Sequence, residues 1–377
     1  MPTAAPIDMA DMPVQLPAAP ASAAARRARF FNSGNAFNVK LAPVPARVFT
    51  DEAAAVQAEG AATGYHLCDQ SAQLGCAFAA TTPLMLARYA RIAPGDTLAA
   101  DFAASGSIWY VIQGQGGSVC GAETIAWAAG DIFLLPGAPG IHHAGPQGAV
   151  LWMVSNEPQL AFDHLQPRST NGPAVPAAMA KTTANVAANI PTSPDAKTPG
   201  GASADATAPG TRNVAGLATP NSTAGTVAAK IQNEEGEAAR LVHYPADEIE
   251  RQFDRLFETA TNDTTSGAAL IFSSVAQQAS RNILPTLTLS FNTLPGGEHQ
   301  RAHRHNSAAI TLIVRGADCH SMVGGIACPW SPWATMVTPP GAPHSHHNGG
   351  TGRAYFLIVQ DGGLHYHART MGFEFME

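Results

Sequence analysis

The stretch GGEHQRAHRHNSAAITLIVRG, residues 296–316, carries the clearest information about the fold of this chain. Its histidines His303 and His305 stand two positions apart, just before a run of apolar and β-branched residues of the kind found in strands. Because successive side chains of a strand point to opposite faces, both imidazoles are expected to point to one face of a sheet. Two nitrogen donors placed in this way can hold a metal ion if a further ligand joins them.

A second histidine-rich stretch, TPPGAPHSHHNGG at residues 338–350, follows in the sequence. It places His344, His346 and His347 in a turn rich in proline and glycine. Nine of the fourteen histidines lie within residues 299–367, and such a concentration needs a cause. Imidazole suits Fe, Zn, Cu, Ni and Mn, and three ligands on one side of an ion leave positions open for water, substrate or dioxygen.

Strand patterns occur in two similar series, one in each half of the chain. Each series has a strand ending in Pro-Gly, a strand ending in Gly, a strand running into a Pro/Gly turn and a final apolar strand. The first series reads LMLARYARI, SIWYVIQG, DIFLLPG and AVLWMVSNEP, and the second reads TLTLSFNTL, AAITLIVRG, ATMVTPPG and AYFLIVQDGG. Alternating strands with frequent turn signals predict an all-β sandwich or barrel, here present twice.

The segment between the two series is rich in Ala, Thr, Pro, Gly and Asn and nearly free of large apolar residues. It cannot bury enough apolar surface to offset the entropy of ordering, which predicts a flexible linker. We therefore expect four regions: a disordered N-terminal tail (1–29), an N-terminal barrel (30–165), a low-complexity linker (166–237) and a C-terminal barrel (238–377).

One helix is predicted within residues 244–258, directly before the second barrel. Ile249, Phe253, Leu256 and Phe257 recur at helical spacing and so form one apolar face. The other helices of the protein are expected to be short and few.

Composition excludes some classes of protein. The chain has 377 residues, a formal net charge of -7 and only 13% charged residues, which argues against a surface that binds nucleic acid. No apolar run approaches the length of about 20 residues that a membrane span needs. The five cysteines include no C-x-x-C pair, and the N-terminus has no apolar core of a secretory signal. A cytoplasmic protein with reduced thiols is expected.

The histidines stand in a pattern that resembles the two motifs of the cupin superfamily. Motif one of that superfamily has Gly, five residues, His-x-His, three or four residues, Glu, six residues and Gly; motif two has Gly, five residues, Pro-x-Gly, two residues, His, three residues and Asn. The chain matches at Gly297, His303, His305 and Gly316, and again at Pro339, Gly341, His344 and Asn348. It departs at Ala309, where the Glu ligand would stand, and at Trp333, where the leading Gly of motif two would stand.

The loss of the Glu ligand makes the chain similar to the bicupins of the gentisate 1,2-dioxygenase family, which are Fe(II) enzymes that cleave aromatic rings. The similarity covers most of residues 240–377, including LPTLTLSFNTLPGGE and LIVQDGGLHYHARTMGFEF, and is fainter in residues 60–165. It implies two cupin barrels, with His303, His305 and His344 as the iron ligands.

The same resemblance implies further roles around the metal. His346 matches a histidine near the substrate and would be the catalytic proton shuttle or oxyanion partner. Asn292 stands where the family often has a Gln facing the pocket, and Thr311 stands where its metal-bearing cupin has a carboxylate-binding Arg. Trp333 is a candidate to line the pocket. In the absence of Arg at position 311, four other arginines are candidates for binding a carboxylate: Arg301, Arg304, Arg315 and Arg353. Asp361 is a candidate to orient a ligand imidazole, or else a plain turn residue.

The first barrel lacks the metal motif. Counting back from Gly114, as from Gly316 in the second barrel, places Asp101 and Ala103 at the two ligand positions. His142 and His143 lie near the position of the motif-two histidine without partners. We expect a degenerate cupin that serves as a structural or dimer-forming barrel, or as a lid.

The resemblance implies a ring-cleaving Fe(II) dioxygenase acting on a hydroxylated, gentisate- or salicylate-like aromatic together with dioxygen. It also implies assembly into a homodimer or homotetramer. Two alternatives stay open from the residues alone: a non-oxidative isomerase, lyase or decarboxylase with Zn, Mn or Ni, and a bicupin that binds a small ligand without catalysis.

Overall fold

The computed structural model describes residues 7–37, 39–165, 240–259 and 268–376. It divides into two compact units, Met1–Pro43 and Val44–Glu377. The first unit contains the short helix α1 (Ala23–Arg26), capped by Ser22, and a bridge between Gln15 and Phe30. The predicted linker lies outside the described residues, and the four predicted domain boundaries stay a prediction.

The second unit is mostly β-structure, and its strands form two jelly-roll groups, as the sequence predicts. In the first barrel the strands follow the order β2-β3-β8-β5-β7-β9, while β4 pairs with β8 and β6 pairs with β5. These strands are β2 (Gly64–Leu67), β3 (Leu86–Ile92), β4 (Thr97–Ala100), β5 (Gly106–Cys120), β6 (Glu123–Ala128), β7 (Ile132–Pro136), β8 (Gly140–Ser155) and β9 (Val242–Tyr244).

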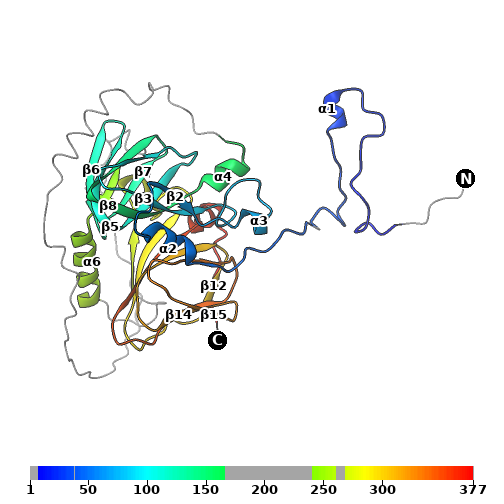
Figure 1. Cartoon of the computed structure of the whole chain (residues 1–377). Helices are drawn as coiled ribbons and strands as arrows, with labels where there is room; N and C mark the ends of the chain where they lie inside the picture. The colour runs from blue at the N-terminus through cyan, green and yellow to red at the C-terminus, as the bar shows by residue number, and fades with distance from the viewer. Residues whose placement is uncertain (1–6, 38, 166–239, 260–267, 377) are drawn as a thin grey trace, which may run out of the picture. The chain divides into compact units, whose positions relative to one another are not determined.

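The second barrel consists of two sheets. The larger has the order β1-β16-β13-β18-β11-β10, and the smaller has the order β15-β14-β17-β12-β19. The larger contains β1 (Val48–Phe49), β10 (Ala268–Phe272), β11 (Thr288–Leu294), β13 (Ala309–Arg315), β16 (Thr335–Thr338) and β18 (Ala354–Gln360). The smaller contains β12 (His303–His305), β14 (Cys319–Val323), β15 (Ile326–Pro329), β17 (His344–Asn348) and β19 (Phe373–Phe375). Figure 1 shows β12, β14 and β15 close to the C-terminus.

The two barrels exchange strands. Strand β1, from the N-terminal side of the first barrel, pairs with β16 of the second barrel. Strand β9 precedes the second barrel in sequence but pairs with β7 of the first. Each barrel is therefore completed by a segment from the other half of the chain.

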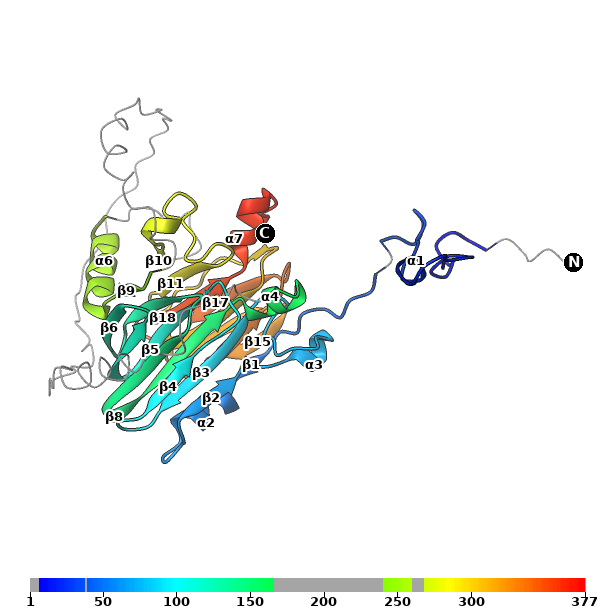
Figure 2. The same ribbon diagram turned by 90° about the horizontal axis from the view of Figure 1, so that it is seen from above.

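A shared hydrophobic core joins the barrels, which lie side by side in Figure 2. Outward-facing residues of both barrels meet there, including Trp152 from the first and Leu312 from the second. The indole Nε1 of Trp152 donates a hydrogen bond of 2.9 Å to Thr335 Oγ1, and the Tyr89 hydroxyl lies 2.7 Å from the same oxygen. Side chains of both barrels pack in one core, and the buried polar atoms in it are hydrogen-bonded across the interface. The two barrels therefore form one packed body.

The predicted helix is confirmed as α6 (Ala246–Thr259), and Ile249 and Phe253 on its apolar face are buried. Phe253 contacts Phe291 and Tyr355 of the second barrel, so the helix covers one end of the shared core. The other helical segments are short: α2 (Asp51–Gln57), α3 (Ser71–Leu74), α4 (Glu157–Phe162), α7 (Gly362–Ala368) and the 3-10 turn η3 (Val275–Gln277).

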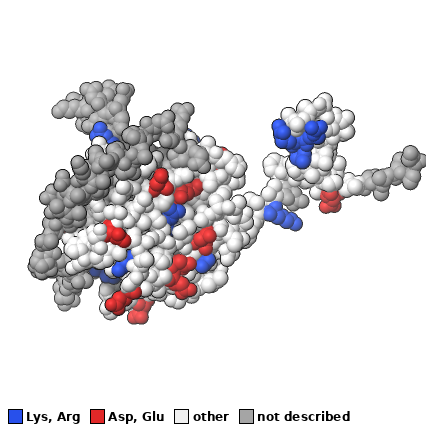
Figure 3. Space-filling model, turned by 45° about the horizontal axis from the view of Figure 1, so that its top comes forward, with Lys and Arg blue, Asp and Glu red and all other residues white. Residues whose placement is uncertain are grey.

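Within the described residues, no helix has the length and apolar character that crossing a membrane requires. On the face of the second unit seen in Figure 3, acidic side chains are scattered over a mostly uncharged surface. The described residues of that face show no broad cluster of Lys and Arg.

Candidate metal centre

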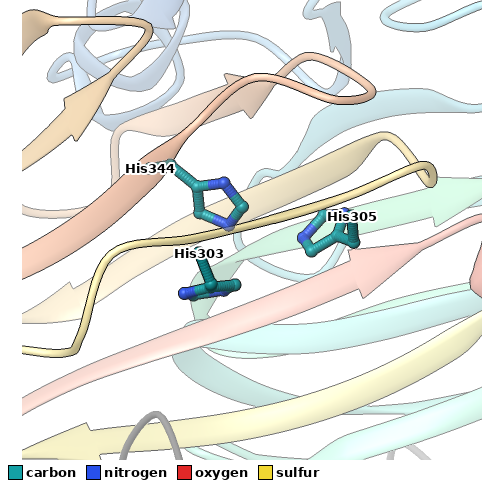
Figure 4. A group of neighbouring side chains, drawn as sticks. All are labelled: His303, His305 and His344. Atoms are coloured by element: carbon teal, nitrogen blue, oxygen red, sulfur yellow. The ribbon is translucent and has the colours of Figure 1, made fainter. Parts of the chain in front are cut away.

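Three histidines converge inside the second barrel, as the sequence predicts. His303 and His305 come from β12, and His344 comes from the neighbouring strand β17, where it pairs directly with His303. One possible ligand nitrogen from each residue lies within 4.8 Å of those of the other two. The three rings face one another in Figure 4, and all three residues are at most 5% exposed.

A hydrogen bond restricts the orientation of each ring and sets its tautomer. The Nδ1 atoms of His303, His305 and His344 lie 2.9, 2.8 and 2.9 Å from the backbone carbonyl oxygens of Arg301, Ser307 and Ala342. A carbonyl oxygen can only accept, so each Nδ1 carries the proton and donates it. The lone pair then lies on Nε2, which is the form of imidazole that binds a metal.

The residues present fit a metal ion. The Nε2 atom of His305 is buried and has no hydrogen-bond partner in the described residues, although buried polar atoms are rarely left unpaired. Burial lowers the pKa of His305 to about 4 and that of His344 to about 3, and the neighbouring imidazoles add to both shifts. Burial also lowers the pKa of His303. Near neutral pH the three rings are therefore uncharged, as metal ligation requires.

His346 points to the same face of β17 as His344 but has a different hydrogen-bond partner. Trp330 Nε1, which can only donate, lies 2.8 Å from Ser321 Oγ, and this oxygen lies 2.7 Å from Nδ1 of His346. A hydroxyl oxygen has two lone pairs, so Ser321 Oγ can either donate to Nδ1 of His346 or accept from it while it accepts from Trp330. Nδ1 of His346 is thus bonded to a side chain of β14, whereas Nδ1 of each of the other three histidines bonds to a backbone carbonyl. The pKa of His346 is well below the usual value because the ring is buried beside other histidines.

Two of the three residues predicted to bind substrate lie inside the second barrel. Thr311 is buried on β13 and alternates with Ile310 and Leu312, which face the core between the barrels. Asn292 is buried on β11 next to the core residue Phe291, so its side chain points inward, where Nδ2 donates to Ser290 Oγ at 2.8 Å.

The structure does not bring Trp333 to the three histidines. Its ring packs against the core between the barrels, 6.1 Å from the ring of Tyr110, and its carbonyl oxygen accepts a hydrogen bond from Tyr89. The role of this residue depends on contacts with the other barrel, which the local sequence does not reveal.

The four candidate arginines have different surroundings. Arg304 forms an ion pair with Glu374 at 2.6 Å, while Arg315 lies over Tyr355 and Arg353 over Phe257. Arg301 stands two residues before His303 on the same side of the chain, and its guanidinium lies 4.7 Å from the ring centre of Phe375. Within the described residues, the structure shows no ion pair to Arg301.

Asp361 does not touch a ligand imidazole. Its Oδ1 accepts a hydrogen bond of 2.9 Å from the backbone N–H of Ala308. The interpretation of Asp361 as the residue that orients a ligand is therefore wrong, and the carbonyl oxygens described above have that role instead. Burial raises the pKa of Asp361 to about 7.

The first barrel has none of the three ligands. Ala100 pairs with Gly140 on neighbouring strands, as His303 pairs with His344 in the second barrel. The positions equivalent to His303, His305 and His344 are thus Ala100, Phe102 and Gly140. The sequence count that gave Asp101 and Ala103 was wrong by one residue, because the connection to the next strand is one residue longer in the first barrel.

Aromatic side chains fill the interior of the first barrel. Trp109 pairs with Phe133 at the position where Thr311 pairs with Met336 in the second barrel, and the two aromatic rings stack with centroids 5.8 Å apart. The ring of His142 lies 4.3 Å from that of Trp109. The large side chains occupy the space that the second barrel leaves for its histidines.

The surroundings of His142 repeat those of His346. Ser118 Oγ lies 2.7 Å from Nδ1 of His142 and accepts a hydrogen bond from Trp127 Nε1. The same serine–histidine–tryptophan arrangement thus occurs in both barrels, with and without the metal ligands. The arrangement therefore joins strands in both barrels, and any chemical role of His346 is additional.

The chain matches no family model. It is 34% identical over 79 residues to a gentisate 1,2-dioxygenase from Ralstonia sp., a match that spans 21% of this chain and about a fifth of that relative. Among solved structures it is similar to a salicylate 1,2-dioxygenase from Pseudaminobacter salicylatoxidans, with a TM-score of 0.61, 15% identity and 88% of each chain covered. A structure of that enzyme with gentisate adducts gives a TM-score of 0.61 at 14% identity, covering 89% of this chain and 86% of the other.

At this level of identity the structural likeness establishes the fold. The described residues form two barrels of this fold, and the second barrel holds a buried three-histidine site. In fold and in this site the chain is similar to the gentisate and salicylate 1,2-dioxygenases, as the sequence resemblance predicts.

Proposed function

We propose that the protein is an Fe(II)-dependent dioxygenase that cleaves the ring of a hydroxylated aromatic acid. The observation that supports this most is the three-histidine site, whose rings are neutral, oriented and free of a fourth protein ligand at Ala309. The similar proteins named gentisate and salicylate 1,2-dioxygenase indicate the class of reaction. The predicted dimer or tetramer and the cytoplasmic location stay predictions.

Bound iron would supply Lewis-acid activation of a ring hydroxyl and one-electron chemistry with dioxygen at the same place. His303, His305 and His344 would hold the ion through their Nε2 atoms. Their burial keeps the site away from bulk water and strengthens each polar contact made within it.

In the proposed reaction His346 donates a hydrogen bond from Nε2–H to an oxygen of the substrate. This role requires that the Ser321 hydroxyl donate to Nδ1, which leaves the proton of the neutral ring on Nε2. Thr311 and Asn292 on the facing sheet provide short polar side chains around the ring. Neither of them carries the charge that a carboxylate needs as partner.

The proposed function is tested by oxygen uptake. The protein is purified anaerobically, reconstituted with Fe(II) and supplied with gentisate, salicylate and aminophenols in separate assays. We expect uptake of one O2 per ring opened with at least one of them, and the loss of ring absorbance. No uptake with any substrate would contradict ring cleavage, and stoichiometric Zn in natively purified protein would favour a non-oxidative cupin.

A second prediction concerns the substrate carboxylate. Arg304 lies on the ligand strand but is paired with Glu374, whereas Arg301 lies directly before that strand, and the described residues give it no acidic partner. We expect Arg301→Gln to raise the KM for an aromatic acid about tenfold or more, because a charge-assisted hydrogen bond contributes about 1.5–3 kcal/mol. The value of kcat should change much less.

The matched control is Arg304→Gln, since Arg304 lies three residues away, points to the opposite face of β12 and is paired with Glu374. It should leave KM within about twofold of the wild-type value, because exposed ion pairs contribute little. Equal effects of the two substitutions on KM would contradict the assignment of Arg301.

A further inference from the structure

The C-terminal strand β19 lies against the strand that carries two of the three metal ligands. Residue by residue, His303 pairs with Phe375, Arg304 with Glu374 and His305 with Phe373. Residues paired across an antiparallel ladder point to the same face. Phe373 and Phe375 therefore point to the side of the sheet on which the ligand imidazoles lie.

Strand β12 depends on β19 for most of its pairing. On its other side it has a single register pair with β17, between His303 and His344. Beyond the ladder, the backbone N–H of Met376 donates to the carbonyl of Ala302 at 2.8 Å. At the opposite end the side chain of Asn306 donates to the carbonyl of Thr370 at 2.7 Å and accepts from the N–H of Gly372 at 2.9 Å. The C-terminal segment thus holds both ends of the ligand strand.

The two phenylalanines also contact a ligand ring directly. The Phe373 ring stacks on the imidazole of His303, with centroids 5.2 Å apart and planes at 29°. The Phe375 ring lies 6.3 Å from the same imidazole and is covered by the guanidinium of Arg301. Phe373 is 49% exposed, so the burial of its apolar surface does not explain its position beside His303. Its geometry relative to His303 points to a role at the metal centre.

We propose that β19 is a positioning element of the metal centre, in which Phe373 and Phe375 hold the His303 ring in the orientation that binds the ion. The proposal rests on the three-histidine site of the proposed function, but not on dioxygenase activity. The hydrogen bond from Nδ1 to the carbonyl of Arg301 still allows the ring to tilt about the bond. A stacked ring removes this freedom, and ordering a ligand before the ion arrives saves conformational entropy on binding.

The experiment measures the affinity of the full-length protein for Zn²⁺ alone by competition with a chelating dye. We expect Phe373→Ala/Phe375→Ala to weaken binding about tenfold, since groups that orient a ligand typically contribute 10–100-fold in metal affinity. The matched control is Glu374→Gln, which alters the residue between them but faces away from the site, and which should change the affinity less than about twofold. Unchanged affinity in the double variant would overturn the proposal.

A double-mutant cycle separates positioning from general damage. In a His303→Ala background the two phenylalanines have no ligand ring to hold, so their removal should have almost no further effect on the remaining Zn²⁺ affinity. A loss of equal size in both backgrounds would mean that β19 acts only on stability, and would overturn the proposal. If the double alanine variant does not fold, the single variants Phe373→Ala and Phe375→Ala are compared in the same cycle. Because oxygen is not involved, the outcome does not depend on the oxygen-uptake assay.

Discussion

Replacing His344 with alanine is expected to abolish both stoichiometric metal binding and oxygen uptake. His344 is one of the three histidines that converge among the described residues, and it is the one that connects β17 to β12. Its removal should lower metal affinity more than a hundredfold, because even residues that merely orient a ligand contribute about 10–100-fold. Metal content by mass spectrometry and oxygen consumption with an active substrate measure the two losses.

The control for His344→Ala is His347→Ala on the same strand. His347 points to the other face of the sheet, where its ring stacks on that of His320 with centroids 4.6 Å apart and its Nε2 lies 2.8 Å from Ser345 Oγ. This variant should keep its full metal content. A His344→Ala protein that still holds one ion per chain would show that the metal is bound elsewhere.

The largest effect on stability is expected from Trp152→Ala. Trp152 is fully buried in the core between the barrels and donates a hydrogen bond to Thr335 of the other barrel. Removing a buried tryptophan side chain leaves a large cavity and typically costs about 3–5 kcal/mol in the free energy of unfolding. The loss of the donor also leaves Thr335 with one partner fewer. Urea-induced unfolding followed by circular dichroism measures the change.

The variant Trp152→Phe separates the effect of side-chain volume from that of the hydrogen bond to Thr335. It keeps much of the volume and removes the indole N–H, so we expect a smaller loss, of about 1–2 kcal/mol. If Trp152→Ala unfolds at the same urea concentration as the wild type, the core between the barrels does not limit the stability of the protein.

The metal centre was predictable because its residues are close in sequence or belong to a spaced motif. His303 and His305 are neighbours on one strand, and His344 follows a Pro-x-Gly turn at fixed spacing. Helix α6 was predictable for a similar reason, since its apolar face repeats at helical spacing within one segment. Local patterns carry such features without any knowledge of the tertiary structure.

Other features depend on contacts between distant segments, and a local pattern does not reveal them. From the sequence, Trp333 is a candidate to line the pocket, whereas in the structure its ring lies beside Tyr110 of the other barrel. The pairing of Ala100 with Gly140 shows that Ala100, and not Asp101, stands at the position of the first ligand, and the sequence alone does not reveal this pairing. Strand β19 is only three residues long, and although its Phe-Glu-Phe alternation is a strand signal, nothing in it indicates that the partner is β12.

The strand exchange between the barrels has a consequence for the order of events during synthesis. The first barrel lacks β9 until residue 244 has left the ribosome, although its strands β2 to β8 end at Ser155. The edge of β7 that β9 later occupies is therefore open while the intervening chain is being made, and open sheet edges invite pairing with other chains. At a synthesis rate of about 5–20 residues per second, this interval lasts several seconds. Midway through translation, when one barrel has been made and its last strand has not, the nascent chain thus exposes a sheet edge that the finished protein covers.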